Sequence, residues 1–262
     1  RLLKLEQKDS RKAKRKDEKA KRKQQRNERN AAGEGLPTAI VLTSDDASAS
    51  AADMGVTVPT PWETWQRLGE PKLVLAPMVN QSELAFRLLA RRHGAGLCYT
   101  PMLHSTRFAA EEAYRVENFD DHPTDRPLVA QFCGDDPATL LAAARHIQGR
   151  CDAVDLNCGC PQAIAKRGHY GAFLLDEPEL IERIVRKLVS GLSVPVFVKI
   201  RVLPSWEATL GLARRIEAAG ASLLTVHGRT REQKTGCECD WARIKQLKQA
   251  LSIPVVANGG VE

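Results

Sequence analysis

The sequence predicts an α/β protein in which a parallel sheet is covered by helices. Seven short apolar runs rich in Val, Leu and Ile recur about 25 to 40 residues apart, which is the length of a strand-helix unit. Continuous apolar strands of this type are typical of a parallel sheet buried on both faces. A chain of this size that alternates strands and helices forms a (β/α)8 barrel or an open doubly wound sheet.

The expected strands, in chain order, are 73–77, 97–101, 128–132, 153–157, 194–200, 223–227 and 253–258. Two of the intervening helices have clear ends. Ser82 is expected to cap the first and Gly94 to stop it, with an inner face made of Leu84, Leu88 and Leu89. Asp176 and Pro178 are expected to open the second, with an inner face made of Leu180, Ile181, Ile184, Val185 and Leu188.

Polar or turn-forming residues lie at or just past the C-terminal ends of several expected strands. They are Pro77, Met78, Gln131, Asn157, Lys199, Arg201, His227 and Asn258. In a barrel these strand ends converge on one mouth, where the active site is built. No GxGxxG motif follows the first strand, which argues against a dinucleotide-binding sheet. The barrel is therefore the favoured architecture.

Charge and composition divide the chain into three parts. Residues 1–30 contain 14 Lys and Arg against 5 Asp and Glu, whereas the rest of the chain contains 25 against 27, so the first part predicts a disordered basic arm. Such arms bind polyanions such as nucleic acids, or serve as nuclear import signals. Residues 31–60 are rich in Ala, Ser, Gly and Thr and indicate a low-complexity linker. The barrel domain is expected to occupy residues 61–262.

The composition also bounds the cellular setting. No apolar run reaches the roughly 18 to 20 residues that a membrane helix needs, so no membrane partner is expected. The seven cysteines are an odd number in a chain too long to need disulfides, which favours free thiols in the cytoplasm or nucleus. Cys98, Cys133 and Cys151 lie in or beside strands and are expected to be ordinary buried thiols.

Cys160 differs from these cysteines, because Gly159 and Pro161 place it on a turn directly after an expected strand. An unperturbed thiol with a pKa near 8.5 is mostly protonated at pH 7 and can donate a proton. Zinc binding by Cys158 and Cys160 with Cys237 and Cys239 is the alternative. Each of these pairs is separated by one residue, however, whereas structural zinc sites usually place two to four between ligands. No metal is therefore expected.

Two cations and a histidine are the other candidate functional groups. Lys199 and Arg201 lie two apart on one strand and so face the same side, where they would suit an anionic ligand or a cofactor that gains negative charge. His227 alone fits either a satisfied core histidine or a site residue. Asn258, Gly259 and Gly260 offer an amide side chain and open backbone N–H groups, as in phosphate-binding turns.

From about Pro71 to Glu262 the chain resembles the tRNA-dihydrouridine synthases, most closely the eukaryotic type that acts on positions 16 and 17 of the D-loop. The stretches that carry the resemblance are 76–87 (APMVNQSELAFR), 97–103 (LCYTPML), 129–134 (VAQFCG), 155–174 (DLNCGCPQAIAKRGHYGAFL), 198–202 (VKIRV), 224–234 (LTVHGRTREQK) and 256–260 (VANGG). Their number and order make the match specific.

The resemblance implies a TIM-barrel reductase in which NADPH or NADH reduces bound FMN. Reduced FMN would pass a hydride to C6 of a flipped-out tRNA uridine while Cys160 protonates C5. The FMN contacts that it implies are Pro77, Met78, Val79, Gln131, Lys199, His227, Asn258, Gly259 and Gly260. The tRNA contacts that it implies are Asn157 and Arg201, with Lys166, Arg167 and Arg229 as further candidates. A monomer is expected.

The chain departs from the family pattern at two points. Gly260 stands where an acidic residue is usual. The pattern also calls for an eighth strand-helix unit and a helical tRNA-binding domain, so the barrel is expected to be truncated after about seven units and to bind FMN weakly. Two other functions fit less well: a non-catalytic RNA-binding module and an FMN oxidoreductase for small pyrimidines. Cys160, Lys199 and His227 on separate strands favour the tRNA-modifying enzyme.

Overall fold

The computed structural model describes residues 59–233 and 236–261. The chain divides into two units, Arg1–Thr57 and Val58–Glu262, and only the second contains described residues. The expected basic arm at 1–30, and the expected linker up to residue 58, lie outside them.

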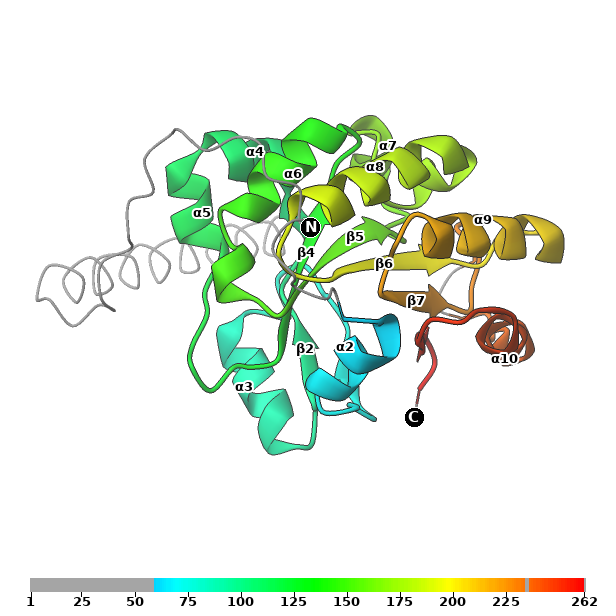
Figure 1. Ribbon diagram of the computed structural model, residues 1–262, viewed down its shortest axis with the longest axis horizontal. Helices are drawn as coiled ribbons and strands as arrows, with labels where there is room; N and C mark the ends of the chain where they lie inside the picture. The colour runs from blue at the N-terminus through cyan, green and yellow to red at the C-terminus, as the bar shows by residue number, and fades with distance from the viewer. Residues whose placement is uncertain (1–58, 234–235, 262) are drawn as a thin grey trace, which may run out of the picture. The chain divides into compact units, whose positions relative to one another are not determined.

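Within the described residues, eight parallel strands form one curled sheet (Figure 1). They are β1 (Val74–Leu75), β2 (Leu97–Tyr99), β3 (Leu103–His104), β4 (Leu128–Cys133), β5 (Ala153–Cys158), β6 (Val196–Arg201), β7 (Leu223–His227) and β8 (Val255–Asn258). The strand order is β1-β2-β4-β5-β6-β7-β8, and β3 also pairs with β4. All seven expected strands are confirmed. The extra strand β3 arises because the run from Leu97 is interrupted at Pro101, which has no N–H to donate, and resumes at Leu103.

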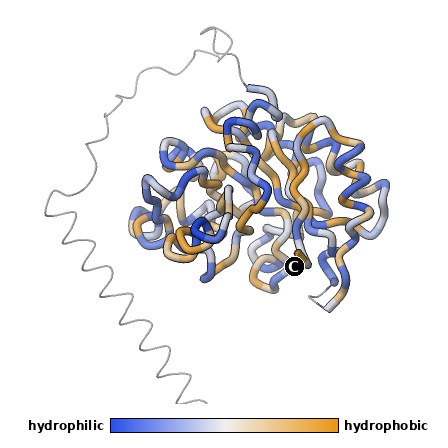
Figure 2. Tube along the Cα trace, turned by 90° about the horizontal axis from the view of Figure 1, so that it is seen from below, coloured by the Kyte–Doolittle hydropathy of each residue, from blue (hydrophilic) through white to orange (hydrophobic). Residues whose placement is uncertain are grey.

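The helices, labelled as in Figure 1, are α2 (Pro61–Arg67), α3 (Leu84–Arg92), α4 (Ser105–Ala110), α5 (Glu112–Asn118), α6 (Pro137–Arg145), α7 (Ala163–Arg167), α8 (Pro178–Gly191), α9 (Trp206–Ala218) and α10 (Trp241–Ala250), with 3-10 turns η2 (Gln148–Arg150) and η3 (Gly171–Asp176). Figure 2 shows hydrophobic residues along the central strands and hydrophilic ones on the outer turns of the helices. None of the helices described here is long and apolar enough to span a membrane.

The sheet separates two cores, because successive side chains of a strand point to opposite faces. In β4, Leu128, Ala130 and Phe132 belong to the large core beneath the helices. Val129 belongs to a smaller core on the inner face. Burial on both faces explains why the strands appear in the sequence as continuous apolar runs.

Helix α8 confirms its expected inner face, since Ile181, Ile184, Val185 and Leu188 are buried and Leu180 is partly buried. Pro178 opens the helix as expected. The expected role of Asp176 is wrong, however: Glu177 occupies the N-cap position, and Asp176 pairs with Arg231 at 2.6 Å.

Helix α3 corrects two expectations. Ser82 is not its cap: Glu83 holds that position, and the Ser82 hydroxyl bonds to the backbone of Met78 instead. Leu89 is 47% exposed, while Arg87 takes the buried place on the helix. An arginine can be buried there because its charge is paired with Asp125 and each of its three guanidinium nitrogens donates a hydrogen bond, which a hydrophobicity pattern cannot reveal. Gly94 does follow the helix end, with φ of 96°.

Helix α2 closes the N-terminal end of the inner core. Thr60 and Glu63 form a reciprocal capping box at its start. Trp62 donates its indole N–H to the Ser252 carbonyl at 2.7 Å, and Lys248 lies over its ring at 4.4 Å. The helix thereby connects the beginning of the sheet to the loop before β8.

Phe108 of α4 is the centre of an aromatic cluster in the large core, so we expect Phe108→Ala to be strongly destabilising. Its ring meets Phe132 edge-on at 5.2 Å and both Phe119 and Tyr114 at 6.3 Å. Loss of a fully buried Phe should lower the free energy of unfolding by about 3 to 5 kcal/mol in urea denaturation. Phe86→Ala, at an exposed position of α3, is the control and should cost less than about 1 kcal/mol. Similar costs for the two variants would contradict this packing.

Candidate functional site

The register of the parallel strands aligns polar side chains on the inner face of the sheet. Asn157 of β5 pairs with Lys199 of β6. Two positions further along β6, Arg201 pairs with His227 of β7, which pairs in turn with Asn258 of β8. Residues that are up to 101 positions apart in the chain are thus neighbours at one end of the sheet. The sequence-based expectation that the strand ends converge is confirmed for these five residues.

A buried amide network connects β4 to the turn that carries Cys160. Asn157 Nδ2 donates to Gln131 Oε1 at 2.8 Å, and Gln131 Nε2 donates to Asp155 Oδ2 at 2.8 Å. Asn157 Oδ1 accepts from the backbone N–H groups of Gly159 and Cys160 at 3.1 and 3.0 Å. Because the two backbone N–H groups can only donate, Asn157 Oδ1 is the acceptor, and this fixes both amide orientations and connects the turn to the network.

The Cys160 turn is enclosed from two further sides. Arg201 Nε donates to the Gly159 carbonyl at 2.7 Å, and the Ala172 N–H donates to the Cys160 carbonyl at 2.9 Å. Gly171, with φ of 68°, lies so close that a Cβ there would be 2.7 Å from the Cys160 carbonyl oxygen. Only glycine therefore permits this approach.

Cys160 is half-buried, as is Cys239 beside Gly259, whereas Cys98, Cys133 and Cys151 are buried, as expected. Burial raises the pKa of both Cys133 and Cys151 to about 12, so these thiols stay protonated and unreactive. Cys158 belongs to the core beneath the helices, on the opposite side of the sheet from the Asn157 network. Across the described residues, no group of three His, Cys, Asp or Glu side chains is placed to hold a metal ion.

Lys199 places a cation in the interior of the site. It is 8% exposed, and within the described residues its amine makes no hydrogen bond or ion pair. Burial lowers the pKa of Lys199 to about 8, an effect that the nearby Asp155 carboxylate partly offsets. Asp155 is fully buried, its pKa is raised by burial to about 7, and its Oδ1 has no partner. An interior cation without a paired anion is costly, which indicates a place for an anionic or electron-rich ligand.

His227 is a neutral donor at the mouth. Its Nδ1 accepts the backbone N–H of Arg229 at 3.1 Å, so the proton lies on Nε2. Burial, reinforced by Arg201, Lys199 and Arg229, lowers the pKa of His227 to about 3. A Cβ at Gly259 would lie 2.8 Å from His227 Nε2, so this edge of the imidazole directly faces the glycine turn.

The Gly259–Gly260 turn has the features of an anion site. Both glycines have positive φ, 98° and 65°. Neither N–H donates to another group within the described residues. A Cβ at Gly260 would lie 3.6 Å from Arg229 Nη2, which places a guanidinium beside the turn. Free amides, a neutral imidazole donor and a cation together suit a phosphate group.

The remaining expected site residues lie further out. Pro77 and Met78 are half-buried in the segment after β1, and Val79 is 51% exposed. Lys166 and Arg167 form the exposed last turn of α7. Asp155 was not singled out from the sequence. The available signal was its place two residues before Asn157, which puts both side chains on the same face of the strand.

The chain matches known proteins over most of its length. The family model described as "Dihydrouridine synthase (Dus)" matches residues 74–262. The chain is 53% identical over 206 residues to the mouse protein named tRNA-dihydrouridine(16/17) synthase [NAD(P)(+)]-like, covering 77% of this chain and 43% of that protein. It is 50% identical over 207 residues to the Saccharomyces cerevisiae tRNA-dihydrouridine(16/17) synthase [NAD(P)(+)], covering 76% and 49%.

A human protein named tRNA-dihydrouridine(20a/20b) synthase [NAD(P)+]-like is 39% identical over 196 residues, which is 74% of this chain and 62% of that one. The chain spans about half the length of the (16/17)-type relatives that it matches.

The buried amine of Lys199 should make stability depend on pH. The folded-state pKa of about 8 lies below the ordinary value of 10.5, so the unfolded chain binds more protons between these two values. Below pH 8 the charged amine therefore destabilises the fold, and this cost disappears as the pH rises to 10.5. Lys199→Met is expected to raise the free energy of unfolding at pH 7 by up to about 3 kcal/mol.

Urea denaturation at pH 7 and pH 10 measures this effect, and the gap between Lys199→Met and wild type should shrink at pH 10. Lys187→Met, on the exposed side of α8, is the control and should shift stability by less than about 0.5 kcal/mol at either pH. A Lys199→Met effect of the same size at both pH values would show that burial of the charge is not its cause.

Proposed function

The chain belongs to the dihydrouridine synthase family, and on that premise we propose that it reduces uridine to 5,6-dihydrouridine in tRNA with NAD(P)H as reductant. The names of its (16/17)-type relatives favour positions 16 and 17 of the D-loop as the target. The observation that carries the proposal is the convergence of Cys160, Lys199 and His227 at one end of the sheet. A protein that only binds RNA has no need of this combination of proton donor, buried cation and neutral imidazole.

We propose FMN as the cofactor, and three features of the chain fit it. The unpaired amine of Lys199 suits the polar edge of a flavin ring. The Nε2–H of His227 and the free amides of Gly259 and Gly260 suit a phosphate tail. When bound, FMN would supply hydride transfer from the nicotinamide to C6 of the uracil ring.

Lys199 would act electrostatically on the flavin. Its positive charge lies in an interior from which water is largely excluded, so it stabilises nearby negative charge more strongly than a surface lysine does. Gln131, whose orientation is set by Asn157 and Asp155, would present its amide to the same edge. The backbone of Pro77, Met78 and Val79 would border the ring, and Asn258 would complete the tail site.

Cys160 would donate the proton. As a hydride reaches C6 and the C5–C6 double bond becomes single, the thiol S–H bond breaks and its proton goes to C5. The thiolate left on Cys160 then recovers a proton from solvent. The amide network of Asn157 holds the Cys160 backbone during this step.

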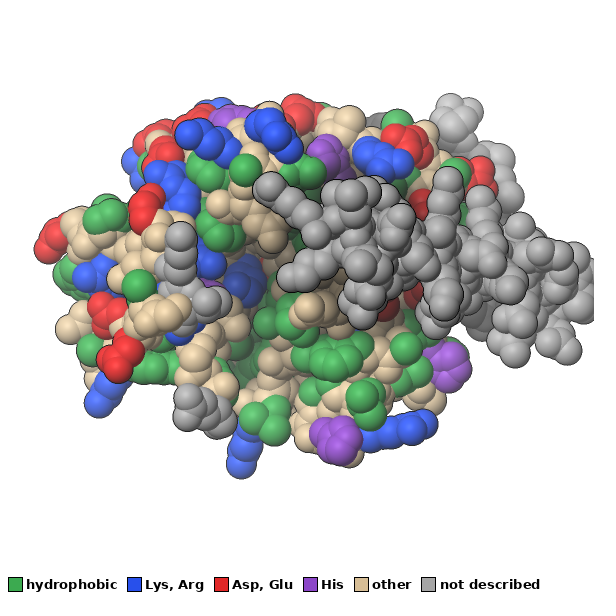
Figure 3. Space-filling view, turned by 180° about the vertical axis from the view of Figure 1, so that it is seen from behind, with side chains coloured by type: hydrophobic (Ala, Val, Ile, Leu, Met, Phe, Trp, Pro, Cys, Tyr) green, Lys and Arg blue, Asp and Glu red, His purple; other side chains and the backbone are tan. Residues whose placement is uncertain are grey.

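Binding of tRNA would combine a base contact with diffuse electrostatics. Arg201 donates to the Gly159 and Thr230 carbonyls. A guanidinium has five N–H donors, so others remain for the flipped-out nucleotide. Lys166, Arg167 and Arg229 would contact phosphates. On the face shown in Figure 3, Lys and Arg side chains are interspersed with Asp and Glu. We therefore propose that the 14 basic residues of segment 1–30 supply much of the salt-dependent affinity.

The proposal is tested with FMN, tRNA and three variants. Wild type should bind FMN in an equilibrium titration of flavin fluorescence, and Lys199→Ala should bind it more weakly. Cys160→Ala should keep the flavin but form dihydrouridine in tRNA at least about 100-fold more slowly with NADPH, because the proton donor is missing. Cys237→Ala, which removes an exposed thiol, is the matched control and should behave as wild type.

A wild-type protein without flavin or dihydrouridine formation would contradict the proposal. So would a Cys160→Ala variant as fast as Cys237→Ala. Reduction of free uridine as efficiently as of tRNA would instead favour a small-pyrimidine oxidoreductase.

A further inference from the structure

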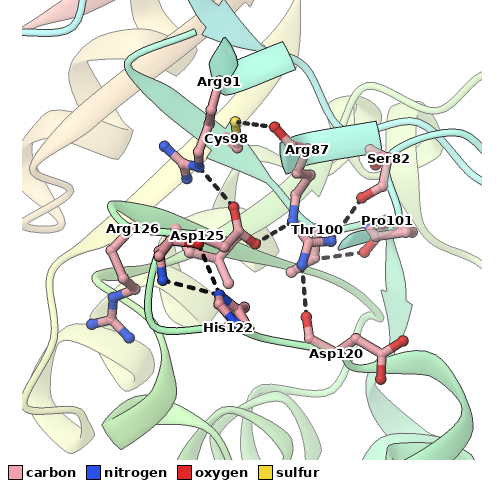
Figure 4. Close-up of polar contacts among 12 residues, drawn as sticks. Ser82, Arg87, Arg91, Cys98, Thr100, Pro101, Asp120, His122, Asp125 and Arg126 are labelled. Carbon is pink, nitrogen blue, oxygen red and sulfur yellow. Dashed lines mark hydrogen bonds and ion pairs between the residues drawn. The ribbon is translucent and has the colours of Figure 1, made fainter. Parts of the chain in front are cut away.

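A buried ion cluster lies beneath α3, outside the site described above (Figure 4). Arg87 is 1% exposed and Asp125 is 0% exposed. Arg87 Nε donates to Asp125 Oδ2 at 2.7 Å, and Arg91 Nε donates to Asp125 Oδ1 at 2.8 Å. Desolvation of such groups offsets most of their attraction, so a buried pair is weak support for stability alone. The cluster is therefore better explained by the segments that it holds in position.

Arg87 extends from the cluster to two other segments. Its Nη1 donates to the Ser82 carbonyl at 2.8 Å, and its Nη2 donates to the Asp120 carbonyl at 2.6 Å. The turn before α3 and the segment between α5 and β4 are thus joined through one guanidinium. The planar fork of arginine allows these directed bonds to form together, which a lysine ammonium cannot reproduce.

The turn that Arg87 holds is Met78–Ser82. The Ser82 hydroxyl accepts the Met78 N–H at 2.9 Å and donates to the Met78 carbonyl at 3.0 Å. The N–H groups of Gln81 and Ser82 donate to the same carbonyl at 3.2 and 3.0 Å. Among the hydrogen bonds of the described residues, the one from Arg87 is the one that reaches this closed turn from outside. The preceding strand β1 is only two residues long and offers little further support.

We propose that Arg87, oriented by Asp125, is a positioning residue that holds the Met78–Ser82 turn at the mouth of the sheet. This inference rests on the proposed function, because Pro77, Met78 and Val79 are the residues expected to border the flavin. Arg87 itself touches none of the reacting groups. It acts through the Ser82 carbonyl on the backbone that the flavin would contact.

The test compares Arg87→Lys with Arg91→Lys. Both variants keep a positive charge on α3 next to Asp125, and each replaces one planar guanidinium with an ammonium. Arg91 differs in that its second bond goes to the Pro127 carbonyl at 2.7 Å and not to the turn. Arg87→Lys should weaken FMN binding about tenfold and speed amide hydrogen exchange at Met78, because a bond from a charged donor is lost. Arg91→Lys should lower the melting temperature comparably while leaving FMN affinity and Met78 exchange close to wild type.

Equal FMN dissociation constants for the two variants would overturn the inference and reduce the cluster to a stabilising role. Should wild type bind no FMN, the proposed function fails, but Met78 exchange in the flavin-free protein still decides the positioning role. Faster exchange in Arg87→Lys than in Arg91→Lys supports it, and equal exchange overturns it.

Ser82→Ala covers the case in which Arg87→Lys does not fold. It removes the hydroxyl bonds to Met78 without touching the ion cluster. Faster Met78 exchange is expected from loss of its acceptor alone, so FMN affinity is the deciding readout: weaker binding is expected if the position of this turn sets the flavin contact, and wild-type affinity would overturn the inference.

Discussion

The parallel register of β5, β6 and β7 is the constraint on which the rest of the site depends. Side chains alternate between the two faces of a strand, so a slip of one residue would turn Lys199 and Arg201 into the apolar core beneath the helices. The register also places Asn157 beside Lys199 and Arg201 beside His227. The apolar residues at alternate positions, such as Val198 and Ile200, prevent the slip because they fill that core. Packing on one face of the sheet thereby sets the chemistry on the other.

The polar inner face is maintained at an energetic cost. Lys199 and Asp155 are both buried. Burial lowers the pKa of Lys199 and raises the pKa of Asp155, so that the neutral form of each is favoured. His227 stays neutral because burial lowers its pKa, an effect that Arg201, Lys199 and Arg229 reinforce. Buried ionisable groups of this kind destabilise a fold unless a ligand or substrate interacts with them. Residues that lower stability in this way concentrate at functional sites. The energetic cost of the site and its proposed role as a cofactor pocket thus have the same physical origin.

Sequence patterns were most reliable where burial alone decides the structure. The seven expected strands and the buried stripe of α8 follow from apolar periodicity, which is a local signal. The expectations failed where a polar side chain had a distant partner. Arg87 and not Leu89 lies on the inner side of α3, because Asp125, 38 residues later, pairs with the charge of Arg87. Ser82 is not the N-cap residue, because its hydroxyl bonds to the backbone of Met78.

The sequence by itself determined the alternation of strands and helices, the positions of the strand ends and the residue types that lie there. Its family resemblance also pointed to Cys160, Lys199 and His227 as a set. Only the tertiary structure decided which of these groups are neighbours, which tautomer His227 adopts, and that Asn157 holds the Cys160 turn. The physical reason is that hydrophobic periodicity is encoded within a few residues, whereas hydrogen bonds and desolvation depend on atoms that folding brings together from distant parts of the chain.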